Sequence, residues 1–192
     1  FASLLLNDEF QRRAIDSIRK GRAGGSVALL GIDGSGKSSH ASLTRRWLEE
    51  RGYRSILIPF HRYMFVETLS TARWSTRRER TQRGGNPLRP LLSLVDNLLL
   101  QFLTSFGCRV EGTVVIYDRF MWSTYIKYFA LGYPVRPLST FYLSVRPRYA
   151  IVLDVPVGKS LKVISSREAH IRYPSRVLEK ERQLYVTIAK RR

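Results

Sequence analysis

The sequence has only one cysteine and three histidines among its 192 residues. The single thiol, Cys108, excludes an intramolecular disulfide framework and fits a reducing compartment, so we expect a cytoplasmic protein. So few sulfur and imidazole ligands also argue against a structural zinc site.

Long apolar runs are scarce as well. The most leucine-rich stretch, residues 91–106, contains Asp96 and Asn97, whereas a membrane span needs about 20 predominantly apolar residues. Asp8 and Glu9 interrupt the first apolar segment, which argues against a secretory signal. We therefore expect no membrane association.

Acidic residues are few relative to basic ones: 15 Asp and Glu stand against 33 Lys and Arg, a formal net charge of +18. Such an excess of positive charge does not indicate a fold, but it indicates that the protein binds anionic partners. Nucleotides, nucleic acid and an acidic membrane surface all fit, and composition does not choose among them. A hydrophobic fraction of 44% and a charged fraction of 25% are typical of globular proteins, so general disorder is excluded.

Apolar runs suited to buried strands alternate with helical patterns along the chain. Strands are expected at residues 26–30, 54–58, 113–117 and 149–153, and helices at 4–20, 37–51, 90–106, 122–131, 157–165 and 175–190. Alternation of this kind predicts an α/β fold in which a parallel sheet carries helices on both faces. We expect a helical extension over residues 1–25 and one domain over 26–192, with ligands bound beyond the carboxyl ends of the strands.

A phosphate-binding loop follows the first expected strand. The run Gly31-Ile32-Asp33-Gly34-Ser35-Gly36-Lys37-Ser38 matches the pattern G-x-x-x-x-G-K-S, with a strand before it and a helix after it. Its glycines let successive backbone N–H groups point at phosphate oxygens, and the helix N-terminus adds to that field. The loop predicts binding of a nucleoside triphosphate. The residues expected to bind it are Gly31, Asp33, Gly34, Ser35, Gly36, Lys37, Ser38 and Ser39.

Three side chains have expected roles toward the phosphates and a metal. Lys37 supplies a positive charge to the β- and γ-phosphates and is expected to face solvent, and Ser38 supplies a hydroxyl ligand for Mg²⁺. Asp118, after the third expected strand, is the carboxylate expected to complete the metal site. A surface salt bridge at a strand end is the alternative role for Asp118.

The loop with its acid Asp33, the pair Asp118-Arg119 and the segment Leu153-Asp154-Val155-Pro156 resemble, in this order and spacing, the thymidylate kinase family of nucleoside monophosphate kinases. The similar region runs from about residue 26 to residue 190. The resemblance implies a three-layer P-loop kinase fold with a parallel sheet of four to five strands. It also implies ATP and Mg²⁺ as cofactors and the conversion of dTMP to dTDP.

The same resemblance implies roles for individual residues. Asp33 would approach the acceptor sugar, and a turn-forming role is its alternative. Arg119 would reach a phosphate or the acceptor nucleotide, and Asp118 would lie near the metal. Arg62 matches, offset by one residue, an arginine that holds the acceptor phosphate, and a solvated loop arginine is the alternative.

A mobile lid is implied over about residues 164–176, after the fourth expected strand. It would supply an arginine to the transferring phosphoryl group, with Arg167 as first candidate and Arg172 and Arg176 in reserve. A solvated basic face is the alternative for this run. The expected catalytic residues are therefore Lys37, Asp118, Arg119 and Arg167.

The expected acceptor site departs from the family at two positions. Ser93 and Asn97 stand where the family has an aromatic residue that stacks on thymine and a nearby arginine. Stacking and one positive charge are lost there, which leaves thymine specificity open. Phe102, Phe106 and Tyr125 are candidates to compensate, and each has a core role as its alternative.

Two other functions stay open. A kinase of the same architecture that acts on another phosphorylated or hydroxylated small molecule is favoured by Ser93 and Asn97. A nucleic-acid-binding P-loop protein is favoured by the net charge and by the basic cluster at residues 73–89, which contains Trp74. No known nucleic-acid-binding module is recognised in the sequence, so we expect nucleotides as partners and no specific nucleic acid. The expected helix at 4–20 has two open roles: it could cover an edge of the sheet, or it could make the contact of a homodimer.

Overall fold

The computed structural model describes residues 25–59, 88–107, 113–166 and 174–190. The helix expected at 4–20 lies outside the described residues, as do Arg62, Arg167, Arg172 and most of the basic cluster at 73–89.

A sheet of four parallel strands forms the middle of the structure, in the order β2-β3-β1-β4. β1 (Ser26–Leu30) pairs with β3 (Thr113–Asp118) on one side and with β4 (Tyr149–Val152) on the other, while β2 (Arg54–Pro59) pairs with the outer side of β3. Every residue of β3 is buried. This suits its β-branched and aromatic sequence, because a parallel strand is covered on both faces.

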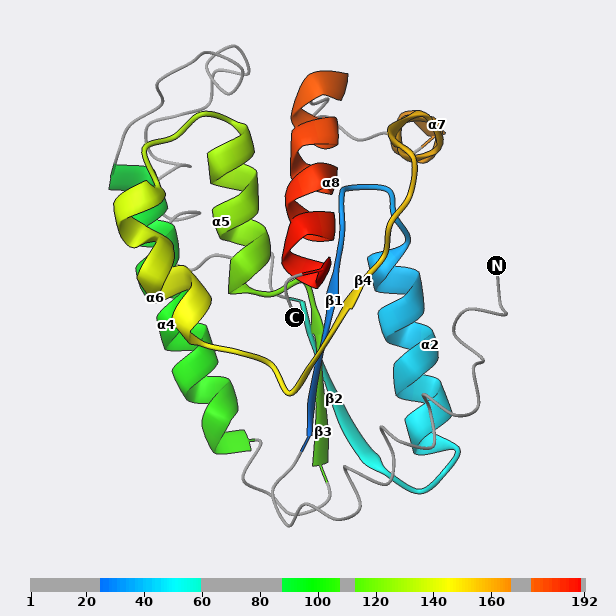
Figure 1. Ribbon diagram of the computed structural model, residues 1–192. Coiled ribbons are helices and arrows are strands. Elements are labelled where there is room, and N and C mark those ends of the chain that lie inside the picture. Colours follow the sequence, from blue (N-terminus) through cyan, green and yellow to red (C-terminus); the bar gives the residue numbers. More distant parts are fainter. Residues whose placement is uncertain (1–24, 60–87, 108–112, 167–173, 191–192) are drawn as a thin grey trace.

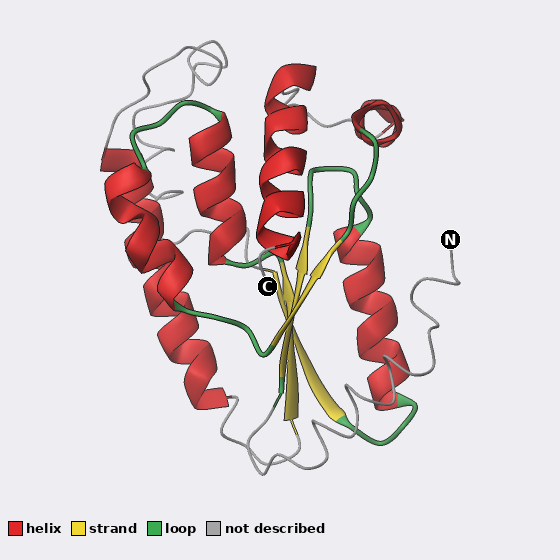
Figure 2. Cartoon of the chain, viewed as in Figure 1, coloured by secondary structure: helices red, strands yellow, loops and turns green. Residues whose placement is uncertain are grey.

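Helices cover both faces of the sheet and give three layers (Figure 1). α2 (Lys37–Glu49) packs on one face against the first three strands. α4 (Leu88–Gly107), α5 (Met121–Ala130) and α8 (Ser175–Lys190) lie on the other face, as Figure 2 shows. α7 (Val157–Ser166) lies beyond the carboxyl end of the sheet, near the loop that connects β1 to α2. The expected α/β P-loop kinase architecture is confirmed.

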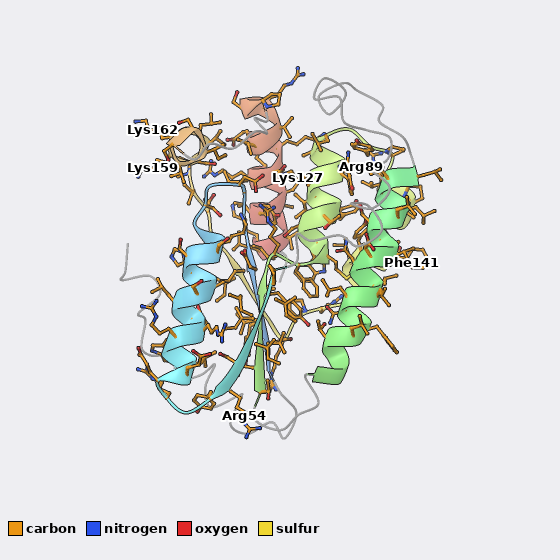
Figure 3. All side chains as sticks on the ribbon, turned by 180° about the vertical axis from the view of Figure 1, so that it is seen from behind. Arg54, Arg89, Lys127, Phe141, Lys159 and Lys162 are labelled. Carbon is orange, nitrogen blue, oxygen red and sulfur yellow. The ribbon has the colours of Figure 1, made fainter. Side chains whose placement is uncertain are left out.

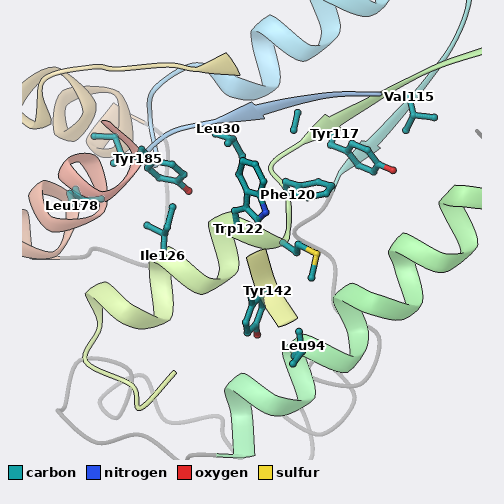
Figure 4. Packing of buried hydrophobic residues seen from close by; sticks show 13 residues of the cluster. Leu30, Leu94, Val115, Tyr117, Phe120, Trp122, Ile126, Tyr142, Leu178 and Tyr185 are labelled. Atoms are coloured by element: carbon teal, nitrogen blue, oxygen red, sulfur yellow. The ribbon is translucent and has the colours of Figure 1, made fainter. Parts of the chain in front are cut away.

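The alternation of side chains along each strand divides the core in two. Val115 and Tyr117 of β3 join a cluster with residues of α4, α5 and α8, which Figure 4 shows at close range. Val114 and Ile116 face the opposite way and join a second cluster under α2. This is the two-residue period of a strand, so one short apolar segment supplies both cores.

One helical segment was not expected from the sequence. The 3₁₀ turn η3 (Arg136–Leu138) and the six-residue α6 (Ser139–Ser144) follow α5 after a short loop, residues 131–135. Tyr142 of α6 is fully buried and donates a hydrogen bond from its hydroxyl to the backbone carbonyl of Pro90, 2.7 Å away in α4. Such a short helix shows too little of the 3.6-residue period to be recognised, and tertiary contacts stabilise it.

The remaining boundaries lie within two residues of the expected ones. α2 ends at Glu49 rather than at residue 51, and α4 begins at Leu88, so that Pro90 lies in its first turn. Proline is tolerated there because the first N–H groups of a helix have no partner within it. None of the described helices is long and apolar enough to cross a membrane.

Candidate active site

Three segments named by the sequence motifs meet at the carboxyl edge of the sheet. The register places Leu29 of β1 beside Asp118 of β3, two residues before the loop begins at Gly31. The N–H of Leu153 donates to the carbonyl of Leu30 at 2.8 Å, which brings the segment after β4 to the same edge. The loop, the Asp118-Arg119 pair and the Leu153-Asp154 segment are therefore neighbours, as the parallel arrangement predicts.

Steric contacts account for two glycines of the loop. A Cβ on Gly31 would lie 2.7 Å from the carbonyl oxygen of Leu153, and one on Gly34 would lie 2.7 Å from the carbonyl oxygen of Ser160. Both have positive φ angles, +143° and +77° respectively, which disfavour a side chain independently of space. The loop thus has its curled form only because these positions carry no side chain.

The side chain of Lys37 lies back over its own loop. Its Nζ donates to the carbonyl of Ile32 at 2.6 Å, and only 4% of the residue is exposed. The expectation that Lys37 faces solvent is wrong, because the ammonium needs a carbonyl partner and finds it in the loop. Burial, together with the nearby Arg119 charge, lowers the pKa of Lys37 to about 7, although Asp33 opposes the shift.

The carboxylate of Asp33 is the electrostatic centre of the site. One oxygen, Oδ1, accepts from Nη2 of Arg119, and the other, Oδ2, accepts from Nζ of Lys127 at 2.5 Å. Burial by itself would raise the pKa of Asp33, but the positive charges of Lys127, Arg119 and Lys37 outweigh it and hold this pKa well below its usual range. Asp33 is therefore ionised, and it neutralises part of a concentrated positive charge.

Lys127 was not among the site residues predicted from the sequence. It lies in α5 and, in Figure 3, reaches the region between α5 and α8. On α8 its nearest carboxylate is Glu181, whose Oε1 is 3.9 Å from the ammonium. One signal was present in the sequence: Lys127 is the only charged residue of the helix expected at 122–131.

Arg119 has an unusual backbone conformation for a residue with a side chain. Its φ of +76° lies in the left-handed region, where non-glycine residues are uncommon. Its N–H donates to the carbonyl of Leu29 at 3.1 Å, so the chain turns sharply while still attached to β1. Such conformations persist where the surroundings enforce them, and here the guanidinium is brought to Asp33.

Asp118 has the properties of a metal ligand. The residue is buried, and its Oδ1 has no hydrogen-bond partner among the described residues. A buried carboxylate oxygen without a partner is costly, and a divalent cation would supply the missing one. Ser38, in the first turn of α2, is exposed and can offer its hydroxyl to the same ion. The residues present thus fit a magnesium ion.

The two residues expected at the acceptor base lie inside the structure. Ser93 is fully buried, and its Oγ forms a 2.6 Å hydrogen bond with the hydroxyl of Tyr128 on α5. Asn97 is also buried, and its Nδ2 has no hydrogen-bond partner in the part of the chain that the structure describes. Ser93 is thus already engaged by the fold, whereas Asn97 has an amide available for a ligand.

The remaining expected residues lie in different surroundings. Arg176, at the start of α8, is exposed, and so is Phe102 of α4. Tyr125 packs against Phe129 and Tyr142, which favours its core role. The side chain of Phe106 lies outside the description.

The segment after β4 both anchors α8 and contacts the loop. Asp154 accepts two hydrogen bonds from Arg182 of α8, at 2.6 and 3.0 Å. Ser160 of α7 donates its hydroxyl to the backbone carbonyl of Asp33. α7 is therefore attached directly to the phosphate-binding loop.

No family model matches the chain. Among curated proteins it is similar to a probable thymidylate kinase of Thermococcus gammatolerans, with 30% identity over 155 residues that cover 73% of this chain and 70% of the relative. A probable thymidylate kinase of Pyrococcus horikoshii is 32% identical over 149 residues, with 73% and 70% covered. One of Thermococcus onnurineus is 27% identical over 186 residues, with 86% and 84% covered.

The lowered pKa of Lys37 predicts that the binding of a phosphate-bearing ligand such as ATP to the loop depends on pH. Phosphate groups next to the ammonium favour its charged form, so above pH 7 binding takes up a proton that the free protein has lost. We expect the affinity for ATP to fall by up to about tenfold per pH unit between roughly pH 7.5 and 9.5. Isothermal titration calorimetry in buffers of different ionisation enthalpy measures both the affinity and the proton uptake.

The control is the variant Lys37→Met, which keeps much of the side-chain length and has no proton to gain. Its weaker binding should not change with pH over this range. If wild-type affinity were equally flat and no proton were taken up, the lowered pKa of Lys37 would be refuted.

Proposed function

Because this chain belongs to the thymidylate kinase family and is thus a phosphotransferase, we propose that it transfers the γ-phosphoryl group of ATP to dTMP and so produces dTDP. The observation that carries the proposal is the phosphate-binding loop at the carboxyl edge of the sheet, with Lys37, Arg119 and Lys127 gathered around Asp33. A site with three cations from three different elements suits a ligand with several phosphate groups.

The loop residues would bind the triphosphate of ATP. Backbone N–H groups of the loop and the N-terminus of α2 face the phosphates, and Lys37 exchanges the Ile32 carbonyl for phosphate oxygens. Transfer then needs little covalent chemistry from the protein, because positioning and fixed positive charges supply most of the rate increase. Arg119 is the candidate to contact the phosphate groups between which transfer occurs.

Ser38 and Asp118 would hold a magnesium ion, which neutralises charge on the β- and γ-phosphates when it is bound. This assignment is supported by the Oδ1 of Asp118, which has no hydrogen-bond partner among the residues that the structure describes. Ser39 is exposed beside Ser38, and we include it among the residues proposed to bind the nucleotide.

The acceptor nucleotide would bind beside α4. The buried Asn97, whose Nδ2 has no partner in the described part of the chain, supports a hydrogen bond to the base. Arg62 and Asp33 are proposed for the phosphate and sugar end. We place Ser93 behind this pocket rather than in it, because its hydroxyl is bonded to Tyr128. An amide that reads the base by hydrogen bonding would replace the aromatic stacking typical of the family.

The domain organisation follows the same proposal. We assign residues 26–192 to the kinase domain, residues 1–25 to an N-terminal extension and about 164–176 to the lid. The contact between Ser160 and the loop supports the lid assignment, because it attaches α7 to the phosphate-binding loop and α7 ends at Ser166, one residue before Arg167. Arg167 is the proposed lid arginine. The single cysteine supports a reducing location, which we take to be the cytoplasm.

A kinase with another acceptor is the second candidate, and the loss of the stacking residue at Ser93 favours it. The nucleic-acid alternative has less support. Arg89, the member of the basic cluster that the structure describes, is half-buried and forms hydrogen bonds with Tyr128 and Tyr133 instead of facing outward.

Turnover with a panel of nucleotides tests the function. We expect dTMP to give the highest kcat/KM among dTMP, dUMP, dCMP, AMP and GMP in a coupled assay of ADP release. The variant Lys37→Ala lacks the ammonium proposed to bind the phosphates and should have no turnover, with its thermal unfolding measured to check that it is folded. A clear preference for a purine nucleotide, or no turnover with any of the five, would reject dTMP kinase activity.

We further propose that the protein forms a homodimer through α4. Leu91, Val95 and Leu98 follow one face of this helix with the 4-and-3 spacing typical of paired helices, and each is at least 38% exposed. A second copy presents the same face, so a twofold axis would bury both.

Light scattering after size exclusion should give the dimer mass for the wild type and the monomer mass for Val95→Asp. Leu43→Asp, on the exposed face of α2, is the matched control, and a monomeric wild type would reject the dimer.

A further inference from the structure

The hydroxyl of Ser160 is used differently from those of other helical serines. Ser144 of α6 and Ser165 and Ser166 of α7 are exposed, and each hydroxyl donates to the carbonyl three residues earlier in its own helix, at 2.9 Å. This is the usual local bond of a serine within a helix. Ser160 is fully buried and donates instead to the backbone carbonyl of Asp33 in the phosphate-binding loop. Its hydroxyl therefore connects two separate elements, α7 and the loop, which lie beside each other in Figure 1.

The same part of α7 packs closely against the loop at Gly34. A Cβ on Gly34 would lie 2.7 Å from the carbonyl oxygen of Ser160, and 3.1 Å from both the Ser160 hydroxyl and a side-chain carbon of Ile164. Ile164 and Leu161 also pack against the larger apolar cluster of the core, which holds α7 in this place. The peptide group between Asp33 and Gly34 therefore borders directly on a helix that cannot easily move away from it.

The orientation of this peptide group decides where its N–H points. In a trans peptide the C=O and the N–H point to opposite sides, and the described residues contain no cis peptide bond. Ser160 binds the carbonyl of Asp33 from the side of α7, so the N–H of Gly34 points away from α7. Among the described residues this N–H has no acceptor, whereas the N–H of Ser35 donates back to the carbonyl of Ile32 at 3.2 Å. The Gly34 N–H is thus available to a ligand in the loop.

We propose that Ser160 is a positioning residue that holds the Gly34 N–H in the direction of a bound phosphate group. Backbone N–H groups of such a loop bind phosphate oxygens, and a donor that is fixed beforehand loses less freedom when the ligand binds. The hydroxyl also polarises the peptide group, because hydrogen bonds in a chain strengthen one another. The inference rests on that part of the proposed function in which the loop binds phosphates, and it does not depend on dTMP as the acceptor.

The first experiment measures the binding of inorganic pyrophosphate by isothermal titration calorimetry. Ser160→Ala removes the hydroxyl and leaves the packing of α7 in place; we expect the affinity to fall by about three- to tenfold, the usual effect of one hydrogen bond. Ser144→Ala is the matched control, because it removes a helical serine hydroxyl that bonds only within its own helix, and it should leave the affinity unchanged. Thermal unfolding of each variant checks that it is folded. Wild-type affinity in Ser160→Ala, or an equal loss in Ser144→Ala, would overturn the inference.

The second experiment follows the Gly34 N–H itself by ¹H–¹⁵N NMR. An amide proton moves downfield when it donates to a phosphate oxygen, so the Gly34 signal of the wild type should move downfield as pyrophosphate saturates the loop. In Ser160→Ala this displacement should be smaller, while the signal of Gly36, in the same loop but without a bond to α7, should move as in the wild type. A merely structural role of Ser160 would not affect Gly34 selectively. The same Gly34 displacement in both proteins would contradict the inference, whatever the affinities.

The results separate this inference from the proposed function. If pyrophosphate binding depends on Ser160 as expected but the wild type does not phosphorylate dTMP, the positioning role stands and the proposed acceptor is rejected. If the wild type phosphorylates dTMP and Ser160→Ala binds pyrophosphate as the wild type does, only the positioning role is rejected. A wild type that does not bind pyrophosphate would refute the positioning role as well.

Discussion

The ion pairs of Asp33 connect the parts of the site to one another. Its side chain binds Arg119 after β3 and Lys127 on α5, and its backbone carbonyl accepts the hydroxyl of Ser160 on α7. In a chain with a formal charge of +18, cations that converge on one loop repel each other strongly unless a carboxylate lies among them. Asp33 provides this negative charge, so the cations can hold fixed positions close to one another.

The loop that carries Asp33 depends on close backbone contacts. Gly31 and Gly34 leave room for the carbonyl groups of Leu153 and Ser160, so the loop, the segment after β4 and α7 lie against each other without intervening side chains. Steric fit and charge therefore act on the same few residues. A phosphate ligand would enter an arrangement whose cations are already placed, which is the condition under which fixed charges contribute most to catalysis.

Much of this arrangement could be predicted from the sequence, because its signals are local. The strands at 26–30 and 113–117 are short apolar runs, and a G-x-x-x-x-G-K-S loop between strand and helix has one usual conformation. Because ligands bind beyond the carboxyl ends of parallel strands, Asp118 and Arg119 were predicted to lie beside the loop. By contrast, Lys127 reaches Asp33 across 94 positions of the chain, and such a contact depends on how α5 packs in the folded protein. The short α6 could not be predicted for the same reason, since its Tyr142 is hydrogen-bonded to Pro90, far away in the chain. The burial of Lys37 depends on how its own loop folds, because its ammonium donates to the carbonyl of Ile32.

Thermal unfolding of Asp33→Asn in the absence of nucleotide tests most directly whether this carboxylate stabilises the cations of the site. The amide keeps the shape and removes the charge, so Arg119, Lys127 and Lys37 lose their common counter-charge. The account predicts that Tm falls by roughly 5–10 °C at low ionic strength, as expected for breaking a partly buried pair, and that added inorganic pyrophosphate recovers most of the loss. Asp154→Asn, which removes the exposed pair with Arg182, should lower Tm by less than about 3 °C. An Asp33→Asn protein as stable as the wild type, with no larger response to pyrophosphate, would contradict the account.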